Sequence, residues 1–456
     1  MIDIKTKVHD RYSVEFKMGF VAGDAPHEDD FSVGMWIFVP GSLDITPNNF
    51  TKAEFYRSVK SNIRLITPHF ELGEIASGKA IPLRNVVAAA AGADYEYQLK
   101  LFCAITKSSL RDERDRICNA ESREERAELA SRYVRSCIDI LKAFERLPEA
   151  NCHDWCGEFL CNTICRNSFH MVEVKGCRDS VLGLIREVNR IRKKHGYATV
   201  DVDSPTGNRD YVHRRGVLKK YVESLLFLRV PKRRDGIIAE QAYYSLAAGL
   251  AMIFATVVAW AFQRHFGNLT WPLFIALIIS YMMKDRIKEL MRYWFAHRLG
   301  DRYFDNKARI SFHGTRIGTL REAMDFIPGG KIPAEGMEVR DSRHLFEAEN
   351  HFRDENVMLY RKSVHLDLQK ISRNSSYAFE GINDIVRLQV RPFLRKMDDP
   401  QVVCNTLGRD GEIVDLMCDK VYPVNIVLQY SSVSQTEYKR FRLILDRDGI
   451  RSIEPV

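Results

Sequence analysis

The sequence predicts an α+β fold that is anchored in a membrane by a central two-helix hairpin. Three observations carry this prediction: alternating apolar residues towards both ends of the chain, long amphipathic helical patterns between them, and two adjacent uncharged runs in the middle. Alternation with a period of two is typical of strands, and apolar residues three and four apart are typical of helices. We therefore expect an N-terminal β-hairpin plus helical bundle, a transmembrane helical hairpin and a β-rich C-terminal domain.

These patterns divide the chain into six consecutive segments. We expect an N-terminal β/α segment, a cytoplasmic helical bundle, a basic linker with a juxtamembrane helix, a transmembrane hairpin, a basic amphipathic juxtamembrane helix and a β-rich cytoplasmic domain. In that order, their ranges are 1–78, 79–196, 197–236, 237–285, 286–306 and 307–456. The linker YATVDVDSPTGNRD (197–210) has the Pro, Gly and Asp residues of a boundary.

The N-terminal segment predicts two strands and a helix. YSVEFKMGFV (12–21) alternates apolar residues, and FSVGMWIFVP (31–40) resembles a buried strand that its proline ends, so the two predict a β-hairpin. In 51–65, Thr51 stands at an N-cap position and Glu54 at the capping-box position. Phe55, Val59 and Ile63 then follow at spacings of four, which predicts one apolar helical face.

The helical region contains a cluster of cysteines within CHDWCGEFLCNTIC. Cys152, Cys156, Cys161 and Cys165 are spaced 4, 5 and 4 apart, which makes them candidates for a metal site. On one helix the first pair and the second pair point in nearly opposite directions, and the tight C-x₂-C turn of structural zinc sites is missing. We therefore expect these thiols to pack in the core of the bundle, with redox sensing as a further alternative. The sequence indicates no cofactor.

The two uncharged runs lie at 242–262 and 269–283. The first has 21 residues, about the ~20 that cross the hydrocarbon core of a bilayer as a helix. The polar link QRHFGN (263–268) between the runs predicts a helical hairpin. The alternative is a buried helical hairpin inside a soluble domain, but a soluble core helix seldom needs so long an uncharged face.

Basic residues flank the hairpin on both sides, and they predict its orientation. The residues expected to meet anionic lipid headgroups are Arg229, Lys232, Arg233, Arg234, Lys284, Arg286, Lys288 and Arg292. Positively charged flanks stay on the cytoplasmic side, which places both termini in the cytoplasm and the hairpin in the inner, cytoplasmic membrane. This placement also explains much of the net charge of +8, so we do not expect nucleic acid as a partner.

Small residues form a narrow row along the first run. Ala247, Ala251, Ala255 and Ala259 recur every four residues, and Ser245 and Gly249 add a second small pair. Such rows allow close backbone approach between membrane helices. The partner of the row is either the second helix of the same hairpin, through Ala276 and Ser280, or a second copy of the chain.

The region after the hairpin predicts strands. The candidates are ARISF (308–312), HLDLQKI (365–371), IVRLQV (385–390), NIVLQY (425–430) and FRLILD (441–446). Asp448-Gly449 is a tight-turn signal, so 441–453 predicts a C-terminal β-hairpin.

No standard catalytic motif occurs in the chain: the P-loop, nucleophile-elbow, zincin and kinase signatures are all missing. An enzyme is therefore the less favoured class. We expect a membrane-anchored interaction or regulatory protein, a scaffold or sensor, with anionic membrane lipids and a cytoplasmic protein as partners. Two alternatives stay open: a homo-oligomeric membrane effector or channel that uses the hairpin, and a membrane-tethered enzyme with an unrecognised site.

Overall fold

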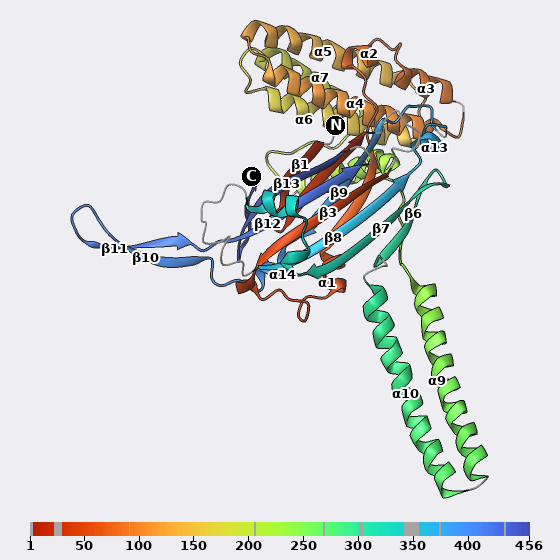
Figure 1. Ribbon diagram of the computed structural model, residues 1–456. Coiled ribbons are helices and arrows are strands. Elements are labelled where there is room, and N and C mark those ends of the chain that lie inside the picture. Colours follow the sequence, from red (N-terminus) through yellow and green to blue (C-terminus); the bar gives the residue numbers. More distant parts are fainter. Residues whose placement is uncertain are drawn as a thin grey trace.

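The computed structural model describes residues 3–21, 30–90, 92–204, 207–267, 270–300, 304–341, 355–373, 375–432 and 435–456. These residues form an α+β structure with large antiparallel sheets, which confirms the predicted fold class at this level. Figure 1 shows a helical bundle at one end, a central β unit, and a long pair of helices that projects from the other end of the β unit.

Eight strands form the larger sheet. In spatial order they are β14 (Gly449–Pro455), β13 (Thr436–Asp446), β12 (Tyr422–Ser432), β3 (Asp30–Pro40), β8 (Glu355–Leu366), β7 (Thr315–Ile327), β6 (Asn306–Phe312) and β5 (Lys232–Arg234). All neighbouring pairs are antiparallel. The predicted hairpin at Asp448-Gly449 is confirmed, because β13 and β14 pair across that turn.

A second, four-stranded sheet packs against the first. Its order is β1 (Asp3–Asp10), β2 (Ser13–Val21), β9 (Gly381–Gln389) and β4 (Val59–Leu65). Side chains of the two sheets share one apolar core, in which the rings of Phe16 and Phe441 lie 5.8 Å apart. At one edge, a strand-like stretch bridges the sheets, because Leu228 N donates to Ile63 O and Arg229 N donates to Ser311 O.

The predicted β-hairpin of 12–21 and 31–40 is wrong. Both segments are strands, but β2 pairs with β1 and β9, whereas β3 pairs with β8 and β12. The physical reason is that β3 is buried on both faces, with Trp36 and Phe38 packed in a second apolar cluster beyond the sheet. An apolar pattern marks a strand but does not specify its partner, which depends on which buried faces fit together. The N-terminal and C-terminal segments therefore share the same two sheets.

The helix predicted over 51–65 is correct only in its first half. Thr51 caps α1 (Lys52–Ser58) with the expected capping box, but residues from Val59 onwards form strand β4. Apolar residues at spacings of four fit the period of a strand as well as that of a helix, and pairing with β9 decides between them. The predicted strand at 365–371 is also wrong, because β8 ends at Leu366 and Asp367 accepts a hydrogen bond from Lys370 N at the start of a short helix.

The bundle lies at one end of the β unit (Figure 1). Its helices are α2 (Leu72–Ala76), α3 (Ile81–Ala89), α4 (Tyr95–Asn119), α5 (Arg123–Glu145), α6 (Asn151–Met171), α7 (Arg178–His195) and α8 (Asn208–Glu223). The remaining short elements are η1 (Gly41–Leu43), η2 (Ser224–Leu226), η3 (Gly329–Lys331), α11 (Ala334–Asp341), α13 (Leu368–Arg373) and α14 (Arg391–Leu394). α8 is held on α6 by the Arg214 guanidinium, which donates to the buried Glu158 carboxylate at 2.8 Å.

Two elements extend away from these packed parts. The projecting helices are α9 (Ile237–Phe266) and α10 (Trp271–Gly300), which run antiparallel beside each other. A two-stranded arm, β10 (Gln401–Leu407) and β11 (Ile413–Asp419), extends from the side of the β unit (Figure 1).

Candidate functional site

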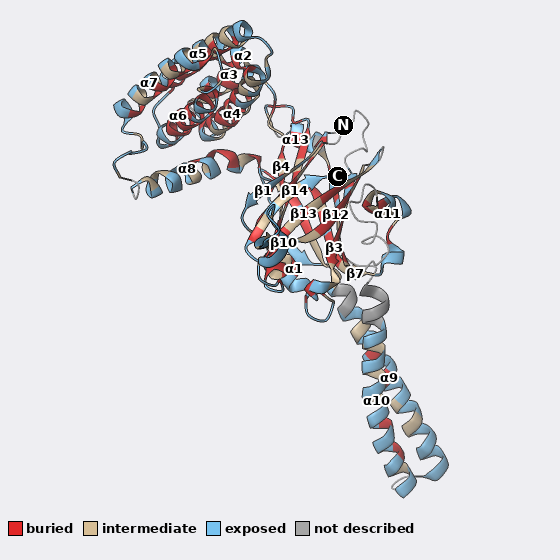
Figure 2. Cartoon of the chain, turned by 90° about the vertical axis from the view of Figure 1, so that its left-hand side faces the viewer, coloured by how far each residue is buried: buried red, intermediate tan, exposed pale blue. Residues whose placement is uncertain are grey.

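The helical hairpin of α9 and α10 exposes apolar side chains over most of its circumference. Figure 2 shows both helices as mostly exposed along their length. The large exposed side chains include Leu250, Met252, Ile253, Phe254, Val257, Trp260, Phe274, Ile275, Leu277, Ile278, Ile279 and Met282. A contiguous apolar surface of this kind marks a contact with a membrane or with another protein. Within the described part of the chain, one segment is long and apolar enough to cross a membrane, Gln241–Phe266 of α9.

α10 differs from the second predicted membrane helix. It is apolar only as far as Met283, and Lys284, Asp285 and Arg286 follow in the same unbroken helix. The segment predicted as a separate juxtamembrane helix, 286–306, therefore begins as the second half of α10, and β6 takes over at Asn306. A transmembrane hairpin of two helices is for this reason not confirmed, because α10 lacks an apolar stretch of sufficient length.

The row of small residues lies between the two helices. Ala247 and Ala251 are 0% and 1% exposed, and on α10 Ala276 and Ser280 are buried opposite the row. Ser280 Oγ donates a hydrogen bond of 3.3 Å to the Ala255 carbonyl oxygen. Ala255 and Ala259 are half-buried at the same seam, whereas Ser245 and Gly249 are exposed on the outer face. The structure thus brings the alanine row, but not the second small pair, against α10.

Seven of the eight basic residues predicted to meet lipid headgroups fall into two groups. Arg229, Arg233 and Arg234 are exposed on the stretch that leads into α9, and the residues from Lys284 to Arg292 lie along α10. Arg292 also sits over the ring of Tyr244 at 5.1 Å, and Lys284 over that of Tyr281 at 4.1 Å.

Lys232 differs from the other seven basic residues. Its ammonium donates at 2.8 Å to the fully buried carboxylate of Glu322, which also accepts hydrogen bonds from Asn306 and Tyr360. The Lys232 side chain, which is 31% exposed, therefore neutralises a buried carboxylate from the edge of the β unit.

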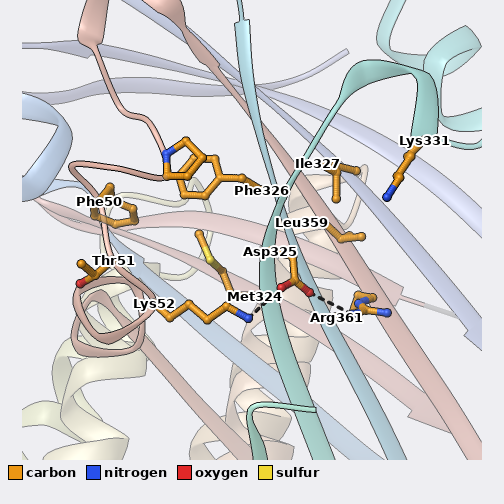
Figure 3. Close-up of a pocket in the computed structure, with 11 residues that line it drawn as sticks. Phe50, Thr51, Lys52, Met324, Asp325, Phe326, Ile327, Lys331, Leu359 and Arg361 are labelled. Carbon is orange, nitrogen blue, oxygen red and sulfur yellow. Dashed lines mark hydrogen bonds and ion pairs between the residues drawn. The ribbon is translucent and has the colours of Figure 1, made fainter. Parts of the chain in front are cut away.

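A pocket of about 480 Å³ opens in the β unit between α1, the end of β7 and β8 (Figure 3). Its apolar wall consists of Pro47, Phe50, Met324, Phe326, Ile327 and Leu359. Its polar lining has three cations, Lys52, Lys331 and Arg361, and one carboxylate, Asp325. Asp325 lies between two of the cations, at 2.7 Å from Lys52 Nζ and 2.9 Å from Arg361 Nη2.

This pocket is connected to the base of the helical hairpin through Asp305. Lys52 Nζ donates to the Asp305 carboxylate at 2.9 Å, and Tyr56 donates to its other oxygen at 2.9 Å. The Asp305 carbonyl oxygen accepts a hydrogen bond from Asp235 N, two residues before α9 begins. Burial alone would lower the pKa of Lys52, but the carboxylates of Asp325 and Asp305 outweigh it and raise that pKa. The Lys52 ammonium therefore stays charged, and it links Asp325 in the pocket to Asp305 at the base of the hairpin.

The four cysteines of the metal candidate do not converge. All lie on the continuous helix α6 and are buried, but Cys156 faces Cys103 of α4, whereas Cys165 faces Cys137 of α5. Burial raises the pKa of the Cys161 thiol to about 12. Across the described ranges, no group of three or more His, Cys, Asp or Glu side chains is arranged to hold a metal ion.

Comparison with known protein families, with characterised proteins and with solved structures gives no match for this chain. The pocket was not found from the sequence. Lys52, Asp325 and Arg361 lie on three elements separated by up to about 300 residues, and none of them stands in a recognisable motif. Only the pairing of β7 with β8, beside the start of α1, brings these side chains together.

Proposed function

We propose that this protein is a membrane-anchored interaction platform. In this proposal α9 and α10 insert into the bilayer as a hairpin, and the β unit and the helical bundle stay together on one side. The observation that carries it is the exposed apolar surface of the hairpin, which has only a thin seam of small residues inside it. A helix pair that belonged to a water-soluble core would bury most of its large side chains.

The arrangement of the chain supports insertion from one side. The chain enters α9 from strand β5 and continues after α10 into strand β6. These two strands are neighbours in the same sheet, so both ends of the hairpin connect to one folded unit. The basic flanks favour the cytoplasmic face for that unit, with both termini in the cytoplasm and with anionic headgroups around the stems.

The depth of the hairpin sets a requirement on the bilayer. Lys284 lies about 20 Å along α10 from its first residue, whereas the hydrocarbon core of a bilayer is ~30 Å thick. We therefore expect the bilayer to thin locally around the hairpin, which costs a fraction of a kcal/mol per Å.

A platform is favoured over a pore because the alanine row of α9 already packs against α10 of the same hairpin. The alanine row that would pack one hairpin on another is already buried against α10, as the 3.3 Å contact of Ser280 with Ala255 illustrates. The pocket at the base of the hairpin gives the platform a recessed surface. Its three cations and one carboxylate suit a cytoplasmic partner that carries an anionic group beside an apolar one.

The decisive experiment compares the full chain with a variant that lacks the hairpin. Residues 237–303 are replaced by a short Gly-Ser linker, which the hydrogen bond between Asp235 N and Asp305 O allows without separating β5 from β6. We expect the full chain to stay with membranes after an alkaline wash, and we expect the variant to be soluble and folded, with a circular dichroism spectrum that lacks only the helical signal of α9 and α10. Release of the full chain by the wash, or retention of the folded variant, would overturn the proposal.

A further inference from the structure

The two cysteines outside the bundle lie together on the exposed arm. Eight of the ten cysteines fall between Cys103 and Cys177, whereas Cys404 and Cys418 stand on β10 and β11. The arm is almost entirely exposed, and among the described strands β10 and β11 pair with each other alone. Cys404 is exposed and Cys418 is half-buried, so reagents in solution reach these two thiols more readily than the buried ones.

The register of the arm places both thiols on one face. Cys418 is directly opposite Val402, and Cys404 is directly opposite Leu416. Side chains two residues apart in a strand share a face, so Cys404 and Cys418 are diagonal neighbours across the two strands. Their interaction, together with nearby Asp419, raises the pKa of the Cys418 thiol, with the contact to Cys404 as the largest cause.

We propose that Cys404 and Cys418 form a reversible thiol–disulfide site, whose co-reactant is a small soluble disulfide. The exposed Cys404, as its thiolate, attacks one sulfur of the small disulfide, forms a mixed disulfide and releases one small thiol. The Cys418 thiolate then attacks the Cys404 sulfur and releases the second small thiol. Overall, two protein thiols and one small disulfide give one protein disulfide and two small thiols.

The diagonal position predicts that the bridge is easily reduced. Diagonal neighbours lie about 7–8 Å apart between Cα atoms, whereas a relaxed disulfide has Cα atoms about 4.4–6.8 Å apart. Closing the bridge thus draws the strands together, which a two-stranded arm without a core of its own permits. A disulfide that distorts the strands is reduced more readily than a relaxed one. As long as the disulfide is present, it holds β10 and β11 in one register.

The buried pair Cys103 and Cys156 provides an internal comparison. The Cys103 thiol lies against the Cys156 carbonyl oxygen at 4.0 Å, and burial raises the pKa of Cys103 well above its usual range. A thiol that is buried and protonated does not exchange. The proposed site thus differs from this pair in access, and both pairs are tested in one sample.

The test uses the full chain and oxidised glutathione. After exposure and blocking of free thiols, a tryptic digest without reductant separates Cys404 on peptide 397–409 from Cys418 on peptide 410–420. We expect these two peptides to be linked in the wild-type protein. In C418S we expect a glutathione adduct on Cys404, and Cys103 and Cys156 stay unmodified in both proteins.

A mixture of isotopically light and heavy protein shows whether the link lies within one copy. Peptides linked light-to-heavy, or a wild-type protein that accumulates the adduct without the link, would overturn the proposal. The control for reversibility is V402C/C404S. In this variant the cysteine introduced at position 402 lies directly opposite Cys418. We expect reduced glutathione to open the native bridge about tenfold more completely than the bridge in that control, and a native bridge that reduced glutathione leaves closed would overturn the proposal.

Discussion

The ammonium of Lys362 and the carboxylate of Asp384 form an ion pair with no exposure to solvent, and this pair joins the two sheets of the β unit. Lys362 lies on β8 of the larger sheet and Asp384 on β9 of the smaller one, while Ser61 of β4 accepts a further hydrogen bond from the ammonium at 2.7 Å. Burial lowers the pKa of Lys362 even though Asp384 opposes that effect.

Removing one partner of this pair is expected to destabilise the β unit strongly. K362M leaves the Asp384 carboxylate buried without compensation, which costs about 3–5 kcal/mol. The double variant K362M/D384L removes both charges and is expected to recover most of that loss. Thermal unfolding of the wild type, K362M, D384L and K362M/D384L in the same detergent measures the effect. If the two single losses simply add in the double variant, the pair does not form in the folded protein.

Ala251 is expected to set the spacing of the helical hairpin. A251L adds a large side chain where α9 touches α10, and overpacking of this kind costs about 1–3 kcal/mol. The matched control is A248L, because Ala248 is exposed on the same helix. We expect the thermal midpoint of A251L alone to fall. A lower midpoint in both variants, or in neither, would mean that the two helices do not pack through this seam.

The arm of β10 and β11 is expected to be dispensable for folding. Its side chains are exposed, and its two ends meet where Lys420 N donates to Pro400 O at 2.8 Å. Replacing 401–419 by two glycines should change the free energy of unfolding by only about 0.5 kcal/mol, since little buried contact is lost. Calorimetry checks this value. A large destabilisation would instead show that the arm packs against a second copy in solution.

Glu15 is expected to make the stability of the smaller sheet depend on acidity. Burial would raise its pKa, but hydrogen bonds from Arg387 at 2.7 Å and Lys7 at 3.0 Å outweigh this and lower it. The native state therefore binds this proton less tightly than the unfolded chain does. The stabilisation is complete above the usual pKa of 4.5 and is lost as the pH falls through the lowered native value.

The measurement for Glu15 is the thermal midpoint of the wild type and of E15Q between about pH 7 and pH 3. We expect the wild type to be more stable at neutral pH and the difference to shrink below about pH 4.5. A difference that stays constant over this range would show that the glutamate is not titrating against its two cationic neighbours.

Sequence patterns predicted secondary structure correctly where the structure of a segment depends only on residues close to it in the chain. The Thr51 cap, the turn at Asp448-Gly449 and the amphipathic helices of the bundle follow from residues within a few positions of each other. The uncharged run of α9 is equally local, because the length and composition of one helix suffice to recognise it. The signal failed at Val59, where a spacing of four fits both a helix and a strand.

The fold class, the pair of apolar helices and several of the strands could therefore be predicted from the sequence, whereas strands such as β1, β4, β7 and β10 were missed. Three features follow only from the packing of distant segments: β3 lies between β8 and β12, Lys362 meets Asp384, and Lys52, Asp325 and Arg361 line one pocket. The physical reason is that strand pairing joins backbone groups that are identical in every residue, so the choice of partner rests on which buried faces fit together across hundreds of residues.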